Sequence, residues 1–274
     1  MELAPLAPLL VDNLESQGGD REDREGPGRP SVLAEAIITA TSMPERLAAV
    51  HQLLEGLLHQ PQPHEPRLCK DLCLAKLVTP LLDLTVETER LPHLPVKLLW
   101  CLAAREDSPG ALDDAIPTIL GILRGTEDTL LAGSSLQLLA ELAHLKSKAL
   151  SSQLCNPKTG VAQLLLRSLW RWGLQAPHLE ITISLLNLLE FAVHVPCHRN
   201  MLRAEVALAA DYSLTLSEAL SQVALGAETR QAQSTDERFG WTWVHAQSRQ
   251  LAREWTGILQ VAELSRPGEE KTRA

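Results

Sequence analysis

Aromatic residues are scarce in this chain, and β-branched runs of the kind that build strands are almost missing. Phe, Trp and Tyr together make up 3% of the 274 residues, whereas hydrophobic residues as a whole make up 45%. Leu and Ala carry most of that apolar content, and both lose little side-chain freedom in a helix. Strands favour the residue types that this chain lacks. The sequence therefore predicts an all-α protein with a sizeable core.

Long basic runs are also missing. The formal net charge is −9 and the isoelectric point is about 5.5. Proteins that bind nucleic acid neutralise the phosphates with a basic face, and this sequence supplies none. We therefore expect one or more proteins as partners rather than DNA or RNA.

No apolar run approaches the length of a membrane span. The segment from Met1 to Leu14 has no basic residue and its apolar stretch is broken by prolines, so it does not match a secretory signal. The cysteines are Cys69, Cys73, Cys101, Cys155 and Cys197. Because their number is odd and most lie in apolar helical patterns, we expect reduced, buried thiols. These observations predict an intracellular protein, cytoplasmic or nuclear, with no membrane contact and no secretion.

The chain divides by composition into a first segment over 1–29, a helical domain over 30–264 and a tail over 265–274. The first segment is rich in Gly, Pro and charge and is expected to be disordered, as is the tail. Leu3–Leu14 is a candidate motif for docking on the body or on a partner. Ser42, followed by Pro44 and Glu45, is typical of a helix start.

The helical domain is expected to contain a succession of short helices joined by short turns. Their expected ranges are 32–40, 44–59, 68–78, 80–86, 94–104, 112–123, 129–145, 161–172, 178–193, 199–208, 213–225 and 236–264. Such a succession fits either a compact helical bundle or a solenoid of stacked helix pairs.

Internal repetition favours the solenoid. One helix type recurs at 77–84, 115–123 and 160–169, and a second type follows each copy, at 96–103, 136–143 and 185–192. Pro117 lies 37 residues after Pro80, and Ala143 lies 40 residues after Ala103. The third copy follows at 45 to 49 residues. These offsets scatter around the period of roughly 40 to 47 residues typical of HEAT and armadillo arrays.

Three stretches of the chain resemble the armadillo/HEAT family. Ala115–Leu120 is similar to the helix that reads aliphatic-Pro-x-Leu-aliphatic in that family, and Leu99–Ala103 is similar to its Leu-Trp-x-Leu-Ala helix. Arg199–Leu202 is similar to the turn that reads Asn-x-x-aliphatic. The resemblance covers about residues 66–210. It implies an all-α, armadillo/HEAT-like α-solenoid of stacked helix pairs with a C-terminal capping helix.

The capping role is assigned to residues 236–264, which carry an apolar stripe at helical spacing. The stripe consists of Trp241, Val244, Leu251, Trp255, Ile258 and Ala262, and the opposite face carries Arg249, Arg253 and Glu254.

One departure from the family bears on function. Importin-like armadillo proteins clamp an extended peptide with an Asn on the second helix type, and the matching positions here are Cys101, Glu141 and Glu190. The resemblance therefore does not imply that nuclear-localisation peptides bind by that clamp. With two glutamates in its place, we expect the groove to prefer a basic or helical ligand.

Two clusters have alternative interpretations. Cys69 and Cys73, with His64 upstream, are either metal ligands or small core residues. The segment from His194 to His198, which includes Cys197, is either a metal or nucleophile–base site or a solvated turn. The second interpretation is favoured for both, because neither has a full ligand set or an orienting carboxylate.

No phosphate loop, dinucleotide fingerprint, nucleophile elbow or zinc-protease motif occurs. We therefore expect no catalytic residue, no cofactor, no metal and no small-molecule substrate.

The tryptophans give the remaining candidates. Trp170 and Trp172 lie two residues apart in a predicted helix, as do Trp241 and Trp243, so one ring of each pair should stay partly exposed. Exposed Trp is enriched at protein interfaces, although these rings also suit gaps between loosely spaced repeats. The candidate partner-binding residues are Glu141, Glu190, Trp172 and Trp243.

The sequence thus predicts a non-catalytic scaffold or adaptor that binds proteins through a helical-repeat surface. The alternative is a structural subunit of a larger complex, for instance a nuclear, chromosome-associated one, that is folded or soluble only with its partners.

Overall fold

The computed structural model describes residues 30–59, 74–89, 91–105, 109–195, 197–199, 202 and 215–264, and for 109 and 262–264 only the backbone. Every regular element within these ranges is a helix, so the all-α prediction is confirmed. None of the described helices is long and apolar enough to span a membrane. The segments 1–29 and 265–274, and the His64–Cys73 cluster, lie outside the described residues.

The chain divides into two compact units, and the boundary lies between Ser147 and Lys148. Nothing in the composition signalled a boundary inside the domain expected over 30–264. Each unit has its own helices and is described by itself below.

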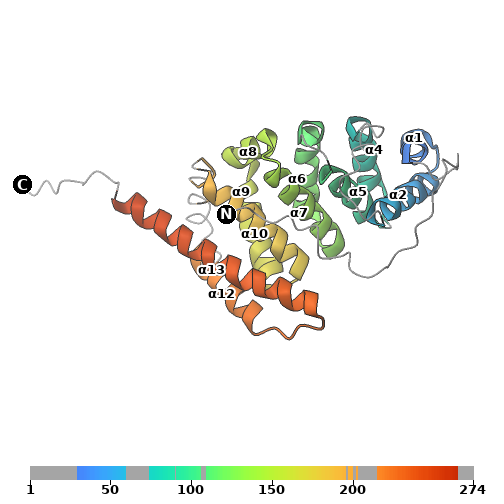
Figure 1. Ribbon diagram of the computed structural model, residues 1–274. Helices are drawn as coiled ribbons and strands as arrows, with labels where there is room; N and C mark the ends of the chain where they lie inside the picture. Colours follow the sequence, from blue (N-terminus) through green and yellow to red (C-terminus); the bar gives the residue numbers. More distant parts are fainter. Residues whose placement is uncertain are drawn as a thin grey trace, which may run out of the picture. The chain divides into compact units, whose positions relative to one another are not determined.

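The first unit packs its helices in pairs that follow the chain (Figure 1). Its elements are α1 (Pro30–Thr39), α2 (Met43–Leu58), α4 (Leu74–Glu87), α5 (His93–Ala103), the 3-10 helix η2 (Pro109–Ala115), α6 (Ile116–Gly125) and α7 (Thr129–His144). Helix α1 packs on α2, α4 on α5, and α6 on α7. Across the pairs, α5 contacts both α2 and α7, and α4 contacts both α1 and η2. Both members of a pair therefore contribute to contacts with the next pair.

Local signals explain where two of these helices begin. The Ser42 side chain accepts a hydrogen bond from the Glu45 amide at 3.4 Å, and Pro44 stands in the first turn of α2, as predicted. At the start of α7, Asp128 Oδ1 accepts from the amides of Leu130 and Leu131 at 2.8 and 3.3 Å. Both caps satisfy amides that have no partner inside the helix.

Helix α4 corrects one prediction. The sequence suggested a break at Pro80, but α4 continues through this residue, which lies in its interior. The Arg46 side chain contacts the same place: its Nη2 donates to the Pro80 carbonyl at 3.1 Å and its Nε donates to the Ile37 carbonyl at 2.9 Å. One guanidinium group thus ties α2 to both α1 and α4.

The second unit contains α8 (Lys148–Cys155), the 3-10 helix η3 (Pro157–Thr159), α9 (Val161–Ser168), the π-helix η4 (Leu169–Gln175), α10 (Leu179–His194), α12 (Leu216–Glu228) and α13 (Thr235–Leu264). Helices α12 and α13 run side by side in opposite directions, joined by a short turn (Figure 1). Helix α13 also packs on α10, and η4 contacts α9, α10 and α12. Neither α8 nor η3 was predicted from the sequence.

The π-helix η4 follows α9 where a single α-helix over 161–172 was expected. The Ala176 amide donates to the Arg171 carbonyl five residues earlier, which is the spacing of a π-turn. Gly173 allows a close approach here, because a Cβ at this position would lie 3.1 Å from Leu169 Cδ1 and 3.3 Å from Val223 Cγ2. The absence of a side chain at Gly173 therefore lets η4 pack closely against α12.

Four leucines from the helices that recur in the sequence lie in the core. Leu99, Leu120, Leu139 and Leu188 are all buried, with at most 1% of the side chain exposed. The order of buried and partly exposed positions is the same over 131–145 in α7 and over 181–195 in α10. Residues 95–105 of α5 follow the same order as 135–145, with one difference at Cys101. The burial pattern of α7 therefore recurs in α10 50 residues later and, apart from Cys101, in α5 40 residues earlier.

The Leu139→Ala change in α7 should lower the free energy of unfolding by about 2 to 5 kcal/mol, because it leaves a cavity in a closely packed core. Leu130→Ala in the same helix is the matched control, since Leu130 is 57% exposed and should lose little. Urea unfolding followed by circular dichroism measures both. Equal losses in the two variants would contradict the assigned core.

Candidate interaction surface on α10 and α13

Helix α13 buries the stripe that the sequence predicted. Trp241, Val244, Leu251 and Trp255 are all at most 5% exposed, Ile258 is partly exposed, and the Ala262 side chain lies outside the described residues. Arg249 and Arg253 are exposed on the opposite face, as expected, whereas Glu254 is half-buried.

Trp172 does not supply an exposed ring. Its side chain is 6% exposed inside η4, with the Arg171 guanidinium 4.5 Å from the ring centre. Of the pair, Trp170 is the partly exposed residue. The expectation that Trp172 supplies an exposed ring is therefore wrong, because Trp172 is the buried member of the pair.

Trp243 lies beside the buried stripe of α13 and is partly exposed. Phe239, one helical turn earlier, is 64% exposed. Residues four apart on a helix lie on the same face, so the two rings form one aromatic strip. The sequence analysis missed Phe239, although its spacing of four residues from Trp243 was visible.

Glu190 of α10 joins this strip through Gln247. The Gln247 side-chain amide donates to Glu190 Oε2 at 2.8 Å, and Gln247 stands one turn after Trp243 on α13. At the other end of the contact, α10 and α13 approach so closely that a Cβ on Gly240 would lie 2.7 Å from Leu179 Cδ2. We call Phe239, Trp243, Gln247, Glu254 and Glu190 the α10–α13 seam.

The seam is acidic and partly desolvated. Burial raises the pKa of Glu190; the nearby His194 lowers it, and the neighbouring Glu254 raises it further. No cation lies within 4 Å of the Glu190 carboxylate among the described residues, and His194 Nδ1 instead donates to the Glu190 backbone carbonyl at 2.7 Å. A negative charge held this way is available to a basic group on another molecule.

Glu141 lies on α7 in the first unit, whereas the seam belongs to the second. Burial raises the pKa of its carboxyl group, and His144 on the next turn lowers it. The matching burial patterns pair Glu141 with Phe191, and Glu190 with Ala140. The sequence alignment that paired the two glutamates was therefore one residue out of register, and the positions that correspond are Cys101, Glu141 and Phe191.

A hollow of about 590 Å³ lies at the turn between α12 and α13. Its lining consists of Ala227, Glu228, Arg230, Gln231, Ala232, Arg238, Trp241, Thr242 and His245. The Arg230 guanidinium covers the Trp241 ring at 4.7 Å and donates to the Pro177 carbonyl at 3.4 Å. His245 Nδ1 donates to the Ala224 carbonyl at 3.0 Å. These contacts fix the turn against α10 and α13.

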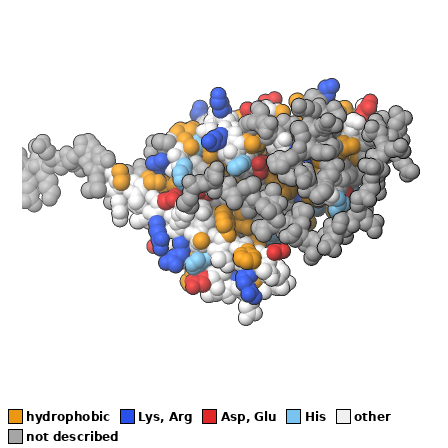
Figure 2. Space-filling view, viewed as in Figure 1, with side chains coloured by type: hydrophobic (Ala, Val, Ile, Leu, Met, Phe, Trp, Pro, Cys, Tyr) orange, Lys and Arg blue, Asp and Glu red, His pale blue; other side chains and the backbone are white. Residues whose placement is uncertain are grey.

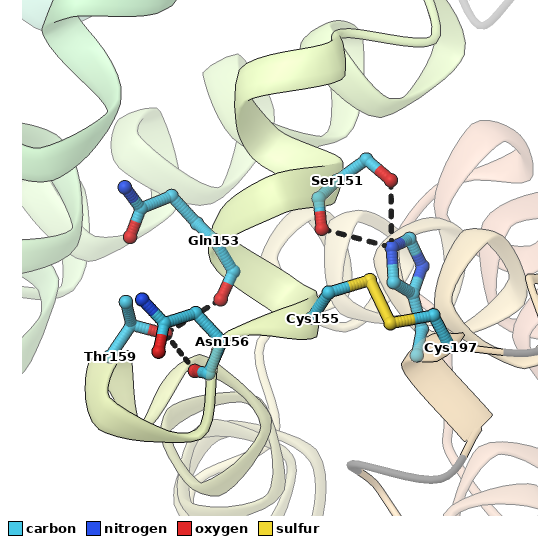
Figure 3. The surroundings of a disulfide bond; sticks show 7 residues. Ser151, Gln153, Cys155, Asn156, Thr159 and Cys197 are labelled. Atoms are coloured by element: carbon cyan, nitrogen blue, oxygen red, sulfur yellow. Dashed lines mark hydrogen bonds between the residues drawn. A yellow bond between two sulfur atoms is a disulfide. The ribbon is translucent and has the colours of Figure 1, made fainter.

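The corner around Cys197 corrects two predictions (Figure 3). Cys197 forms a disulfide with Cys155 at the end of α8, where free thiols were expected. His198 is 1% exposed rather than solvated, and its ring packs 5.2 Å from Phe191. Cys101 is free and buried, as predicted. Within the described parts of the chain, no three His, Cys, Asp or Glu side chains are grouped so that they could hold a metal ion.

His198 and Ser151 have the residue types of a base and a nucleophile, but their geometry favours a structural role. His198 Nε2 lies 2.9 Å from Ser151 Oγ and 3.1 Å from the Ser151 carbonyl oxygen. The carbonyl can only accept, so Nε2 carries the proton and does not take one from the hydroxyl. Burial lowers the pKa of His198, which keeps the ring neutral near pH 7.

The surface view agrees with a mixed rather than a basic exterior. On the face shown in Figure 2, the Lys and Arg side chains of the described residues lie in small groups, with Asp and Glu among them. No continuous basic field of the kind that tracks a phosphate backbone is visible on that face.

Glu190→Gln should raise the melting temperature at pH 7, because it removes a half-buried charge and keeps an oxygen that accepts from Gln247. The folded pKa of Glu190 lies above its unfolded value, so the penalty exists above the folded pKa and disappears as the pH falls below the unfolded one. The difference between variant and parent should therefore shrink from pH 7 to pH 4 in differential scanning calorimetry. Glu35→Gln, at an exposed position of α1, is the control. If the difference in melting temperature between variant and parent does not change with pH, the buried Glu190 charge does not destabilise the fold.

No family model matches this chain, and neither curated proteins nor solved structures give a match. The armadillo/HEAT resemblance therefore stays a prediction.

Proposed function

We propose that this protein is a non-catalytic interaction module that binds a partner protein through the α10–α13 seam. The observation that carries the proposal is the aromatic strip: Phe239 is 64% exposed beside a partly exposed Trp243, next to the acidic Glu190. Large aromatic side chains dominate the energy of protein interfaces, and exposing them to water is unfavourable.

The loss of folding stability caused by the half-buried Glu190 charge supports the same proposal. A carboxylate whose pKa is raised by burial destabilises the folded state near neutral pH. Residues that reduce stability in this way are candidates for function, because activity and stability often conflict at a site. A basic partner side chain would offset the lost hydration of Glu190.

The partner segment that fits best is basic. It is either helical or extended, with its side chains free to contact the seam. A Lys or Arg that faces Glu190 can lay its stem over Trp243, which stands one turn from Gln247 and whose ring also attracts a cation. The importin-type clamp has no support, since Cys101, Glu141 and Phe191 stand where that clamp requires Asn.

The fold proposed for this module is an armadillo/HEAT-like α-solenoid with α13 as its C-terminal cap. The successive packing of α2, α5 and α7, and the repeated burial pattern of α5, α7 and α10, support it. Such arrays present long faces suited to binding proteins. We further propose a cytoplasmic or nuclear location.

A structural subunit of a larger complex is the second candidate, and the end of α13 favours it. Ser217 at the start of α12 contacts Thr256 at 3.0 Å, so the last residues of α13 extend past α12. Val261 in this extension is 63% exposed, and Figure 2 shows hydrophobic side chains on it. A larger assembly would cover this end.

Phe239→Ala and Trp243→Ala should each weaken partner binding by about 1 to 4 kcal/mol, since each removes an aromatic anchor. Quantitative affinity purification from cells, comparing parent and variants, identifies the proteins whose recovery depends on the strip. Calorimetric titration with the purified partner then gives the affinities. Arg253→Ala, an exposed change on the far face of α13, is the matched control.

The melting temperatures of the three variants must stay close to that of the parent for the comparison to hold. If the same proteins are recovered at the same level with all variants, the seam is not the binding surface. Light scattering after size-exclusion chromatography separates the two candidates, because an adaptor should be monodisperse alone and an obligate subunit should aggregate.

A further inference from the structure

We propose that Cys155 and Cys197 form a reversible redox site, at which a low-molecular-weight disulfide of the glutathione class exchanges with the protein and locks α8 onto the end of α10. Cys155 is the last residue of α8, and Cys197 lies three residues beyond the end of α10. Their Cα atoms are 5.6 Å apart, a separation that a disulfide spans without moving the backbone. The proposed interaction module does not depend on this site.

Solvent access makes the bond exchangeable. Cys197 is exposed and Cys155 is partly exposed, whereas the free Cys101 is 3% exposed in the core of the first unit. An exposed disulfide is open to attack by small thiolates, and exposed bonds are the ones that exchange readily. In a cytoplasmic or nuclear protein such a bond is typically transient or regulatory.

Noncovalent contacts hold the Cys197 segment in place from both sides. The His198 ring bonds to Ser151 of α8, in the turn that precedes Cys155 (Figure 3). Arg199 Nε donates to the Val193 carbonyl at 2.6 Å and its Nη2 donates to the His194 carbonyl at 3.1 Å, which ties the segment to the end of α10. These contacts keep the two sulfurs near each other after reduction, so the bond can close again.

The disulfide adds the one covalent tie in this corner. Helix α8 has eight residues and packs against α9 and η3. A helix this short is marginal by itself, and its position depends on its neighbours. Breaking the bond leaves α8 and residues 197–199 joined through His198 and Ser151, and both segments should open more often.

The protein disulfide forms in two thiol–disulfide exchange steps. The Cys197 thiolate attacks one sulfur of oxidised glutathione, which forms a mixed disulfide on Cys197 and releases one glutathione thiolate. The Cys155 thiolate then attacks the Cys197 sulfur and expels the second glutathione thiolate. Two protein thiols and one oxidised glutathione thus become one protein disulfide and two reduced glutathiones, which take up the two protons and two electrons.

The test uses the full chain with Cys69→Ser and Cys73→Ser, so that these two thiols do not compete. The protein is equilibrated in glutathione buffers from fully reduced to fully oxidised, quenched with acid, alkylated and mapped by mass spectrometry. We expect the Cys155 and Cys197 peptides to carry two alkyl groups in reducing buffer and none in oxidising buffer. Cys101→Ala should leave this transition unchanged.

Two further readouts make the test specific. Cys155→Ser should stop the second step and accumulate a glutathione adduct on Cys197. Amide hydrogen exchange in residues 148–155 and 197–199 should be faster in the reduced parent than in the oxidised parent, with the core of α13 unchanged. A bond that never forms in the oxidising buffer, one that persists in the reducing buffer, or equal exchange in both states would each overturn the proposal.

Discussion

Leucine burial on more than one side of short helices is the constraint on which both units depend. Helices α5, α7 and α10 each bury seven or more residues, and their exposed positions are few and regularly spaced. Helices of 11 to 16 residues are marginal by themselves in water. Each therefore exists because its neighbours cover it, which explains why α5 contacts α2 on one side and α7 on the other.

The ends of these packed helices carry polar groups that need partners, and arginines supply several of them. Arg105 donates to the Cys101 carbonyl at 2.6 Å and to the Leu57 carbonyl at 2.9 Å, which joins the last turns of α5 and α2. Arg46 donates to the Ile37 carbonyl in the last turn of α1 and to the Pro80 carbonyl inside α4, and Arg199 donates to two carbonyls at the end of α10. The planar guanidinium satisfies carbonyls of two turns at once, so the same contact caps helices and fixes their packing.

The candidate site follows from where this packing stops. Between α10 and α13, Gln247 and Glu190 form a polar contact beside the apolar ones, and Trp243 and Phe239 stand one and two turns before Gln247 on α13. The acidic group there is held at a cost to stability, and the aromatic rings remain in contact with water. The proposed redox site at Cys155 and Cys197 differs from the seam, because it controls the connection between α8 and the end of α10 and leaves the residues of the seam unchanged.

Periodicity and composition alone determined the helical class, the caps at Ser42, the buried stripe of α13 and the core leucines. These are local properties: they depend on residues within a few turns of each other, and propensity and spacing express them directly. Trp243 as a surface candidate also came from spacing, because it lies off the apolar stripe of its helix, whereas Glu190 came from its match to the Asn position of the armadillo family.

The tertiary structure alone decided the remaining features, which depend on residues far apart in the chain. Pro80 stays inside α4, a π-turn buries Trp172, and the two cysteines meet across 42 residues. Burial also shifts the register by one residue, so that Glu141 matches Phe191 and not Glu190. Leu-rich helices look alike at several registers, and only contacts with neighbouring helices select one of them.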